Sequence, residues 1–364
     1  MSEDLTSSDT GSSSVVGVLL VNLGTPDAPT RFAVRRYLKE FLSDPRVIEY
    51  PRWLWWLILN LVILNVRPAR SAKAYQEIWT DHGSPLLCIS RNLAQGLQRE
   101  LHAQSNTSIM VALAMRYGEP SVRSALQSLR AQRLQRLLVV PMYPQYSGTT
   151  TGSVFDAVAD ELKKWRWVPE LRMINAYHDN TEYIRAIAAK ITSHWRNQTP
   201  AGRLVFSFHG LPKRYFMAGD PYYGQCHKTA ELVANLLGLD DERWCVAFQS
   251  RFGREEWLQP YTDAVLLDLA ARGVRSVDLV CPGFAVDCLE TLEEIDQQNR
   301  RLFMNAGGER FSYIPCLNED AMHISMLAEL VLTHVQGWHA RVTSAWPTRS
   351  TDSNGTATAV GNAV

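Results

Sequence analysis

The sequence predicts an α/β protein with two similar domains, each a four-stranded parallel sheet flanked by helices. Eight short apolar runs alternate mostly with helical patterns, and they fall into two sets of four. The last three runs of each set follow one another at similar intervals, as expected if one structural plan occurs twice. A chain of 364 residues also exceeds what one hydrophobic core normally supports. We therefore expect two Rossmann-like domains with a ligand cleft between them.

The expected strands are rich in Val, Ile, Leu and aromatic residues and are punctuated by Gly, Pro or Asn. In the first domain, expected at residues 15–178, they cover 16–24, 111–118, 136–144 and 171–178. In the second domain, expected at residues 179–340, they cover 203–212, 244–253, 276–284 and 311–318. The first interval is roughly 50 residues longer in the first domain, which predicts a functional insertion there.

Composition bounds the remaining possibilities. Residues 1–14 and 349–364 contain almost no large hydrophobes, so disordered tails are expected at 1–14 and 341–364. The N-terminal residues lack the apolar core of a signal peptide, and the six cysteines form no CxxC pair, which together favour a cytoplasmic protein without disulfides. Thirty-seven basic residues balance thirty-seven acidic ones, so no nucleic-acid partner is expected.

The insertion contains an apolar segment, residues 51–66, which we call the lip. As a helix its core would span about 21 Å, short of the roughly 30 Å hydrocarbon layer of a membrane. Three tryptophans at one end and flanking arginines suit a segment that dips into a membrane surface or borders an apolar ligand mouth. A buried core helix is the alternative, because tryptophan clusters also occur inside proteins.

Two features of the second domain could carry chemistry. The run SFHGLP places His209 at the end of an expected strand, although a lone histidine is more often structural than a ligand. Asp287, Glu290 and Glu294 would line one face of a helix that follows another strand, although a solvated acidic face would look the same. Imidazole and carboxylates without thiolates would suit a divalent iron ion that is held and then released.

Other strand ends carry cationic and aromatic residues. Tyr143 precedes a Gly/Thr/Ser turn at residues 147–153, which could receive a carboxylate or be a plain helix cap. No lysine follows the second glycine of this turn, so a nucleotide P-loop is disfavoured. Arg116, Tyr117 and Trp257 near other strand ends would suit a flat, carboxylated, aromatic ligand.

Nine motifs in order resemble the ferrochelatase family, from Val16 to about Trp338. They are VNLGTP (21–26), RRYLKEFLSDPRVIE (35–49), HGSPL (82–86), AMRYG (114–118), PMYPQYSGTTTGS (141–153), SFHGLP (207–212), YGQCHKTA (223–230), FQSRFG with WLQPYTD (248–263) and CPGFAVDCLETLEEI (281–295). The resemblance implies a chelatase-like fold. It also implies an enzyme that inserts Fe(II) into protoporphyrin IX to form protohaem with release of two protons, the terminal step of haem biosynthesis.

Carried over by position, the family's catalytic and metal-site residues fall on His209 and Glu290, with Glu294 and Asp287 as a possible relay. The resemblance places the lip at a membrane surface, which implies peripheral association with the inner face of the cytoplasmic membrane. The porphyrin contacts that it implies are Arg116, Tyr117, Tyr143, Trp257 and Arg67.

Two departures limit this transfer. Members with an iron–sulfur cluster need cysteines near the C terminus, whereas none follows Cys316, so no cluster is expected. Gln298 stands where some members continue the acidic row. No organic cofactor is implied, and ferrous iron is a substrate. The alternatives are another tetrapyrrole chelatase, acting on coproporphyrin with iron or inserting cobalt or nickel, and a porphyrin carrier without catalysis.

Overall fold

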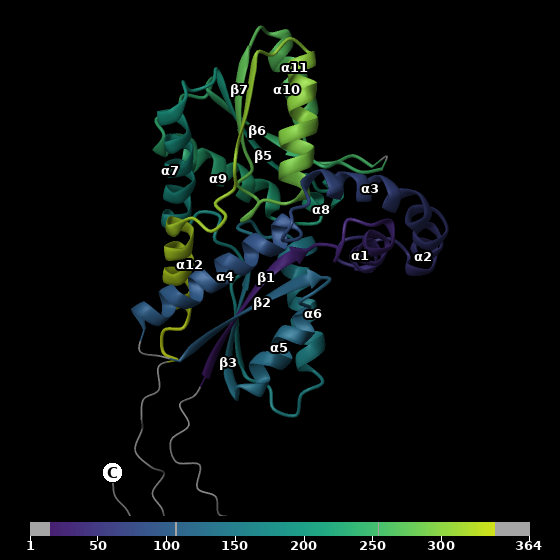
Figure 1. Ribbon diagram of the computed structural model, residues 1–364, viewed down its shortest axis with the longest axis vertical. Coiled ribbons are helices and arrows are strands. Elements are labelled where there is room, and N and C mark those ends of the chain that lie inside the picture. The colour runs from purple at the N-terminus through teal and green to yellow at the C-terminus, as the bar shows by residue number, and fades with distance from the viewer. Residues whose placement is uncertain (1–14, 106–107, 254, 339–364) are drawn as a thin grey trace, which may run out of the picture.

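The computed structural model describes residues 15–105, 108–253 and 255–338, and the expected tails at 1–14 and 341–364 lie outside them. The described residues form two four-stranded sheets, one above the other in Figure 1. The strands are all paired in parallel. The predicted fold class is therefore confirmed.

The two sheets repeat one strand order. The first sheet has the order β2-β1-β3-β4 and the second β6-β5-β7-β8, so each sheet begins with its second strand and continues with its first, third and fourth. The strands are β1 (Val15–Gly24), β2 (Ile109–Tyr117), β3 (Leu134–Pro141), β4 (Glu170–Met173), β5 (Arg203–His209), β6 (Trp244–Gln249), β7 (Ser276–Val280) and β8 (Arg310–Ile314). The repeat that the sequence intervals predict is thus present in the sheets.

Helices cover both sheets, and among the described residues three of them have π-helical hydrogen bonding. The α-helices are α1 (Arg31–Ser43), α2 (Arg52–Ile58), α3 (Leu64–Ile78), α4 (Pro85–Gln104), α5 (Val122–Ala131), α6 (Ser153–Leu162), α7 (Thr181–Asn197), α8 (Lys213–Met217), α9 (Tyr222–Leu236), α10 (Thr262–Ala271), α11 (Arg300–Asn305) and α12 (Ala321–His334). The π-helices are η1 (Leu59–Ile63), η2 (Gly148–Gly152) and η3 (Glu290–Asn299).

Alternate residues of the central strands enter different cores. Val16, Val18 and Leu20 of β1 pack into a core that also contains Phe206 of β5, whereas Leu19 packs on the opposite face of the first sheet. Burial on both faces explains why the strands read as continuous apolar runs rather than as an alternation. The two sheets therefore share one continuous core.

The C-terminal part of the described chain also joins the two halves. Helix α12 packs against both α4 and α7, as Figure 1 shows. Beyond it, the indole of Trp338 donates to Glu170 at 2.6 Å, and the guanidinium of Arg172 lies 4.3 Å from the Trp338 ring centre. The exact domain boundary that we expect after residue 178 stays a prediction.

Several strands end earlier than the sequence pattern predicts. The run 171–178 is strand only as far as Met173, and the run 276–284 only as far as Val280. Proline has no backbone donor, so Pro282 cannot continue a central ladder. Apolar residues beyond these ends, such as Tyr177 and Val286, belong to loops that pack into the core shared by the two sheets.

Candidate active site

His209 is the last residue of β5, which lies between β6 and β7 in the second sheet. Its ring nitrogen Nδ1 lies 2.6 Å from the backbone oxygen of Gly210, so Nδ1 carries the ring proton and Nε2 keeps its lone pair. Burial lowers the pKa of His209, and the negative charge of Glu290 opposes this shift. The imidazole is therefore neutral near pH 7, the form that accepts a proton or a metal ion.

Glu290 is the first residue of η3, at the carboxyl-end side of β7. The side-chain amide of Gln249 donates to the backbone oxygen of Glu290 at 2.8 Å and so fixes the start of this helix. Burial lowers the pKa values of both His209 and Arg67, and the charge of Glu290 opposes both shifts. The structure thus brings the predicted histidine and glutamate within electrostatic reach of each other and of a cation from the first half of the chain.

Two buried tyrosines from the first half complete this set. Burial raises the pKa of Tyr37 and Tyr75 well above the usual value, and the charge of Glu290 raises both further, so both hydroxyls keep their protons. The Tyr37 hydroxyl donates to the backbone oxygen of Gly24 at 3.2 Å. Neither tyrosine is predicted as a site residue from the sequence. Tyr37 lies in the matching stretch 35–49, which is the signal that could have found it.

Arg67 links the lip to the second half of the chain. It lies in the first turn of α3, and its guanidinium carbon lies 4.6 Å from the ring centre of Phe252, in the segment after β6. Burial lowers the pKa of Arg67, and Glu290 is the largest opposing influence. Arg67 is thus placed beside the His209 and Glu290 pair, and its expected contact with a porphyrin stays a prediction.

Glu294 lies one helical turn after Glu290 and is held by Ser250. The backbone N–H of Ser250 donates to one carboxylate oxygen at 2.8 Å, and its hydroxyl donates to the other. Burial nevertheless raises the pKa of Glu294 to about 7, and the charges of Glu290 and Glu293 add to the shift. A carboxyl that titrates near neutral pH has the property that a proton relay requires.

Asp287 has a different environment. It is 4 % exposed, and its carboxylate accepts hydrogen bonds from Thr291 at 3.0 Å, from Asn318 at 2.6 Å and from the Tyr313 hydroxyl. The backbone N–H of Cys316 donates to the same carboxylate at 3.3 Å. These donors tie the start of η3 to the segment after β8. A relay role for Asp287 stays a prediction, and its contacts describe a residue that positions η3.

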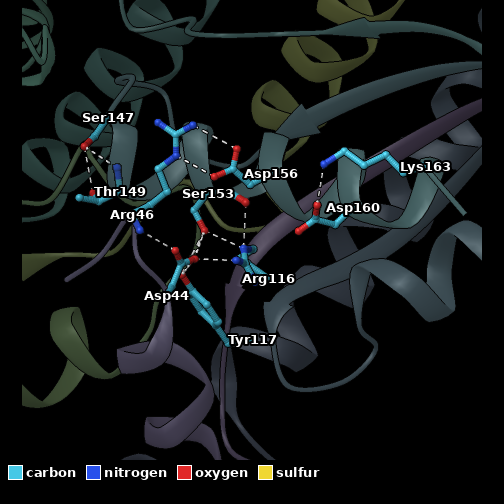
Figure 2. Close-up of polar contacts among 10 residues, drawn as sticks. All are labelled: Asp44, Arg46, Arg116, Tyr117, Ser147, Thr149, Ser153, Asp156, Asp160 and Lys163. Atoms are coloured by element: carbon cyan, nitrogen blue, oxygen red, sulfur yellow. Dashed lines mark hydrogen bonds and ion pairs between the residues drawn. The ribbon is translucent and has the colours of Figure 1, made fainter. Parts of the chain in front are cut away.

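Arg116 and Tyr117 belong to a buried network, shown in Figure 2. The Arg116 guanidinium donates to Asp44 at 2.5 Å and to the Ser153 hydroxyl at 2.6 Å, and the Tyr117 hydroxyl donates to the same Asp44 oxygen at 2.7 Å. Tyr117 is only 1 % exposed. The network fixes the segment after α1 to the start of α6. Direct porphyrin contacts by Arg116 and Tyr117 stay predictions, and the contacts seen here are structural.

Tyr143 and Trp257 have buried donors without partners. Neither the Tyr143 hydroxyl nor the Trp257 indole N–H has a hydrogen-bond partner among the described residues, although both atoms are shielded from solvent. Burial raises the pKa of Tyr143, so its hydroxyl stays protonated, and the nearby Arg116 opposes the shift. Buried donors normally have a partner, so these two are open to a ligand or water. Their expected role as porphyrin contacts stays a prediction.

Helices α2, η1 and the start of α3 form the lip, which has two faces. Trp55, Leu59 and Leu64 are buried against α1 and its surroundings, and the Trp55 indole donates to the backbone oxygen of Leu42 at 2.6 Å. The opposite face is apolar and exposed: Trp53 is 70 %, Trp56 60 %, Leu61 65 % and Val66 72 % exposed. A fully buried core helix, the alternative reading of this segment, does not fit these exposures.

Neither of two cavities in the described residues coincides with this set of residues. One of about 520 Å³ lies between the end of α4 and α12, and one of about 480 Å³ lies between α7 and residues 314–322. The part of the chain that the structure describes has no group of three or more His, Cys, Asp or Glu side chains placed to hold a metal. It also has no helix long and apolar enough to cross a membrane.

The family model described as Ferrochelatase matches residues 15–335. The chain belongs to the ferrochelatase family. A protein named Ferrochelatase from Nitrosococcus oceani is 58 % identical over 323 residues, which cover 89 % of this chain and 88 % of that protein. Another of the same name from Thioalkalivibrio sulfidiphilus is 54 % identical over 90 % of this chain and 89 % of its own length. The family is one of enzymes that insert metal into porphyrin, so this chain is an enzyme of that kind.

Two solved structures with a similar fold share little sequence with this ferrochelatase family member. The structure titled SirB from Bacillus subtilis with Fe3+ has a TM-score of 0.54 at 10 % identity and covers 89 % of this chain and 96 % of that one. A sirohydrochlorin chelatase SirB in complex with cobalt has a TM-score of 0.51 at the same identity, over 89 % of this chain and 97 % of that one. These likenesses support the fold alone.

Proposed function

We propose that this chain inserts ferrous iron into protoporphyrin IX, releases two protons and so forms protohaem, the last step of haem biosynthesis. Membership of the ferrochelatase family supports the reaction. The observation that carries the assignment of residues is the electrostatic pairing of His209, at the end of β5, with Glu290, at the start of η3. Iron is a substrate in this proposal, and no organic cofactor or iron–sulfur cluster takes part.

Metal insertion requires that two pyrrole N–H protons leave while Fe(II) exchanges water for four ring nitrogens. His209 is suited to accept a proton or bind iron, because its Nδ1 is engaged by Gly210 and its Nε2 has a free lone pair. Glu290 supplies a negative charge beside it that favours both the approach of Fe(II) and an imidazolium. Glu294 then takes the role of relay, since its pKa of about 7 lets it gain and lose a proton near neutral pH.

Porphyrin binding is assigned to residues around this pair. Arg67 supplies a cation at the lip edge for a propionate, and Tyr143 and Trp257 supply buried donors that lack partners in the protein. Arg116 and Tyr117 act indirectly in this proposal, by positioning other residues, because their polar groups are hydrogen-bonded to Asp44 and Ser153. A porphyrin with two carboxylates and a largely apolar ring fits a site with a cation beside an apolar lip. A tetrapyrrole with many carboxylates would leave charges unpaired against the apolar lip, which is costly.

The exposed face of the lip is assigned to a membrane surface. Trp53, Trp56, Leu61 and Val66 form an apolar face too exposed for a protein core, and tryptophan is favoured at the boundary between lipid and water. The enzyme in this proposal is cytoplasmic and binds the inner face of the cytoplasmic membrane peripherally. Its porphyrin would then pass from the lipid surface to the site without crossing water.

Anaerobic incubation of the full chain with protoporphyrin IX and Fe(II), followed by the absorbance spectrum of haem, tests the function directly. Parallel reactions with coproporphyrin and with Co(II) or Ni(II) compare the competing substrates. A clear preference for coproporphyrin would overturn the proposed substrate and keep the chelatase assignment. Tight porphyrin binding without metal insertion by any of the three ions would support the carrier alternative instead.

A further inference from the structure

Arg214 joins the base of the lip to the segment after β6. It lies in α8, five positions after His209. Its guanidinium forms an ion pair with Glu49 at 3.3 Å and another with Glu255 at 2.5 Å. Its guanidinium carbon also lies 5.5 Å from the ring centre of Tyr50. Glu49 and Tyr50 immediately precede the lip, so one side chain connects the lip base with the second half of the chain.

The rest of α8 makes the same two connections. The Tyr215 hydroxyl donates to the backbone oxygen of Val47 at 2.8 Å, and Tyr215 is only 5 % exposed. On the other side, the backbone N–H and the ammonium group of Lys213 each bond to Glu256 at 2.9 Å. Helix α8 is therefore held on one side by residues 47–50 and on the other by residues 255–256.

Residues 44–50 are in turn fixed to the first half of the chain. Asp44 accepts hydrogen bonds from the Arg116 network, and Arg46 pairs with Asp156 at 2.7 Å, as Figure 2 shows. The lip itself is bonded to the end of α1, because Arg52 donates to the backbone oxygen of Ser43 at 2.5 Å. The contacts of α8 with residues 47–50 therefore hold a segment that is fixed to the first half of the chain and leads directly into the lip.

The charges around Arg214 explain why this side chain matters. Glu49 comes from the first half of the chain and Glu255 from the second, and both contact the same guanidinium. Without that positive charge, two carboxylates would face each other across the gap between the halves and repel. Arg214 converts this repulsion into attraction, which holds the lip base and the segment at residues 255–256 together.

We propose that Arg214 is a positioning residue that clasps the lip base to the segment after β6 and so sets how readily the porphyrin binds and the product leaves. This inference rests on the proposed function, because it concerns porphyrin binding and product release at the same site. Arg214 lies in the helix that follows the His209 turn, so its clasp fixes the lip relative to the catalytic strand end without contacting the reacting atoms. The insertion step itself is expected to depend little on Arg214.

The test compares Arg214→Met and Arg214→Lys with the wild-type enzyme. Methionine keeps most of the apolar stem and removes the charge, so we expect the KM for protoporphyrin to rise about threefold or more while single-turnover insertion with saturating porphyrin stays within about twofold. Lysine should restore part of the difference. Because salt screens exposed charges, raising the ionic strength should raise the KM of the wild type by a larger factor than that of Arg214→Met, in which only the contact of Arg67 with a propionate remains to be screened.

Arg272→Met is the matched control, since Arg272 also forms an exposed ion pair, with Asp268 at 2.9 Å at the C-terminal end of α10. Its KM should equal that of the wild type. An Arg214→Met enzyme with wild-type KM and wild-type salt dependence would overturn the proposal, as would an equal rise in KM for Arg272→Met.

Two measurements test the clasp even if no iron is inserted. They are porphyrin affinity, followed by tryptophan quenching, and amide hydrogen exchange of residues 51–66. Loss of all insertion by the wild type would overturn the proposed function alone. Weaker porphyrin binding together with faster exchange in Arg214→Met would still support the clasp, and unchanged values of both would refute it.

Discussion

The side-chain amide of Gln249 donates to the backbone oxygen of Glu290 across 2.8 Å. Gln249 is also the β6 residue in register with His209, and its backbone oxygen accepts the N–H of Gly210 at 2.7 Å. Its other side-chain atom, Oε1, accepts the hydroxyl of Ser207 at 2.7 Å. One buried side chain therefore fixes the proposed catalytic glutamate relative to the strand end that carries the proposed catalytic histidine.

Replacing Gln249 by Leu should impair turnover more than porphyrin binding. Leucine has a similar volume, but it removes the donor to Glu290 and leaves the Ser207 hydroxyl with one partner fewer, at a cost of about 1–3 kcal/mol of stability. We expect kcat to fall about tenfold or more, because small misplacements of a catalytic group are costly. Stopped-flow turnover and thermal unfolding measure the two effects. Gln104→Leu, on the exposed end of α4, is the control, and a kcat within twofold of wild type would contradict the positioning role.

Much of the fold was predictable because its strands have a simple signature. A parallel strand covered on both faces needs apolar residues at every position, and runs such as that of β1 show this directly. His209 and Glu290 were predictable as candidates because each follows such a run. The resemblance to the ferrochelatase family also predicted that the two act as a pair, but nothing in the sequence gives the distance between the end of β5 and the start of η3.

The rest of the site depends on contacts between distant segments. Tyr75 has the pattern of a core residue in α3, and only its packing beside Glu290 gives it a place near the site. Tyr117 is the opposite case. Its place at a strand end predicts a ligand contact, but its hydroxyl donates to Asp44 in the structure. The division of the lip into a buried and an exposed face also requires knowledge of what covers Trp55.

Substitution of neighbouring tryptophans in the lip should have two different effects, because some are exposed and one is buried. The exposed Trp53 and Trp56 should bind membranes, so Trp53→Ser with Trp56→Ser should lower liposome binding and raise the KM for protoporphyrin without lowering stability. The buried Trp55 should stabilise the fold, so Trp55→Ala should cost about 3 kcal/mol or more of unfolding free energy. Liposome sedimentation and chemical denaturation measure the two effects. If the double variant sediments with liposomes as well as wild type does, the membrane assignment of the lip is wrong.

The raised pKa of Glu294 predicts a pH dependence of stability in the protein without metal. Because the folded value of about 7 lies above the usual 4.5, the folded state binds more protons between these values, and stability should fall as pH rises through that window. The side chain is partly solvated, so the effect should be about 1–2 kcal/mol rather than the full shift. Urea denaturation of wild type and Glu294→Gln at pH 5 and pH 8 measures it. Glu242→Gln, at an exposed position, is the control, and identical slopes for wild type and Glu294→Gln would show that Glu294 is not perturbed.

His209 and Glu290 should both be required for insertion and dispensable for folding. His209 makes one side-chain hydrogen bond, to its neighbour Gly210, so His209→Ala removes little that holds the structure together. Glu290 is held through its backbone oxygen, so Glu290→Gln should leave η3 in place. Both changes remove a group that accepts protons or binds iron, and each should lower turnover by roughly a hundredfold or more. Glu294→Gln should be milder, because water can replace a relay residue.

Three measurements on the same variants separate chemistry from binding and stability: turnover, porphyrin affinity and melting temperature. We expect turnover alone to fall, with His102→Ala and Glu242→Gln at exposed positions as matched controls. Burial lowers the pKa of His209, so the wild type should keep its turnover at the usual histidine pKa of about 6.5. Turnover should be lost only at lower pH, where the imidazole gains a proton. That acidic limb should be absent from the residual activity of His209→Ala. A His209→Ala enzyme that keeps near-normal turnover would exclude His209 as base and ligand, because alanine has no lone pair with which to accept a proton or bind iron.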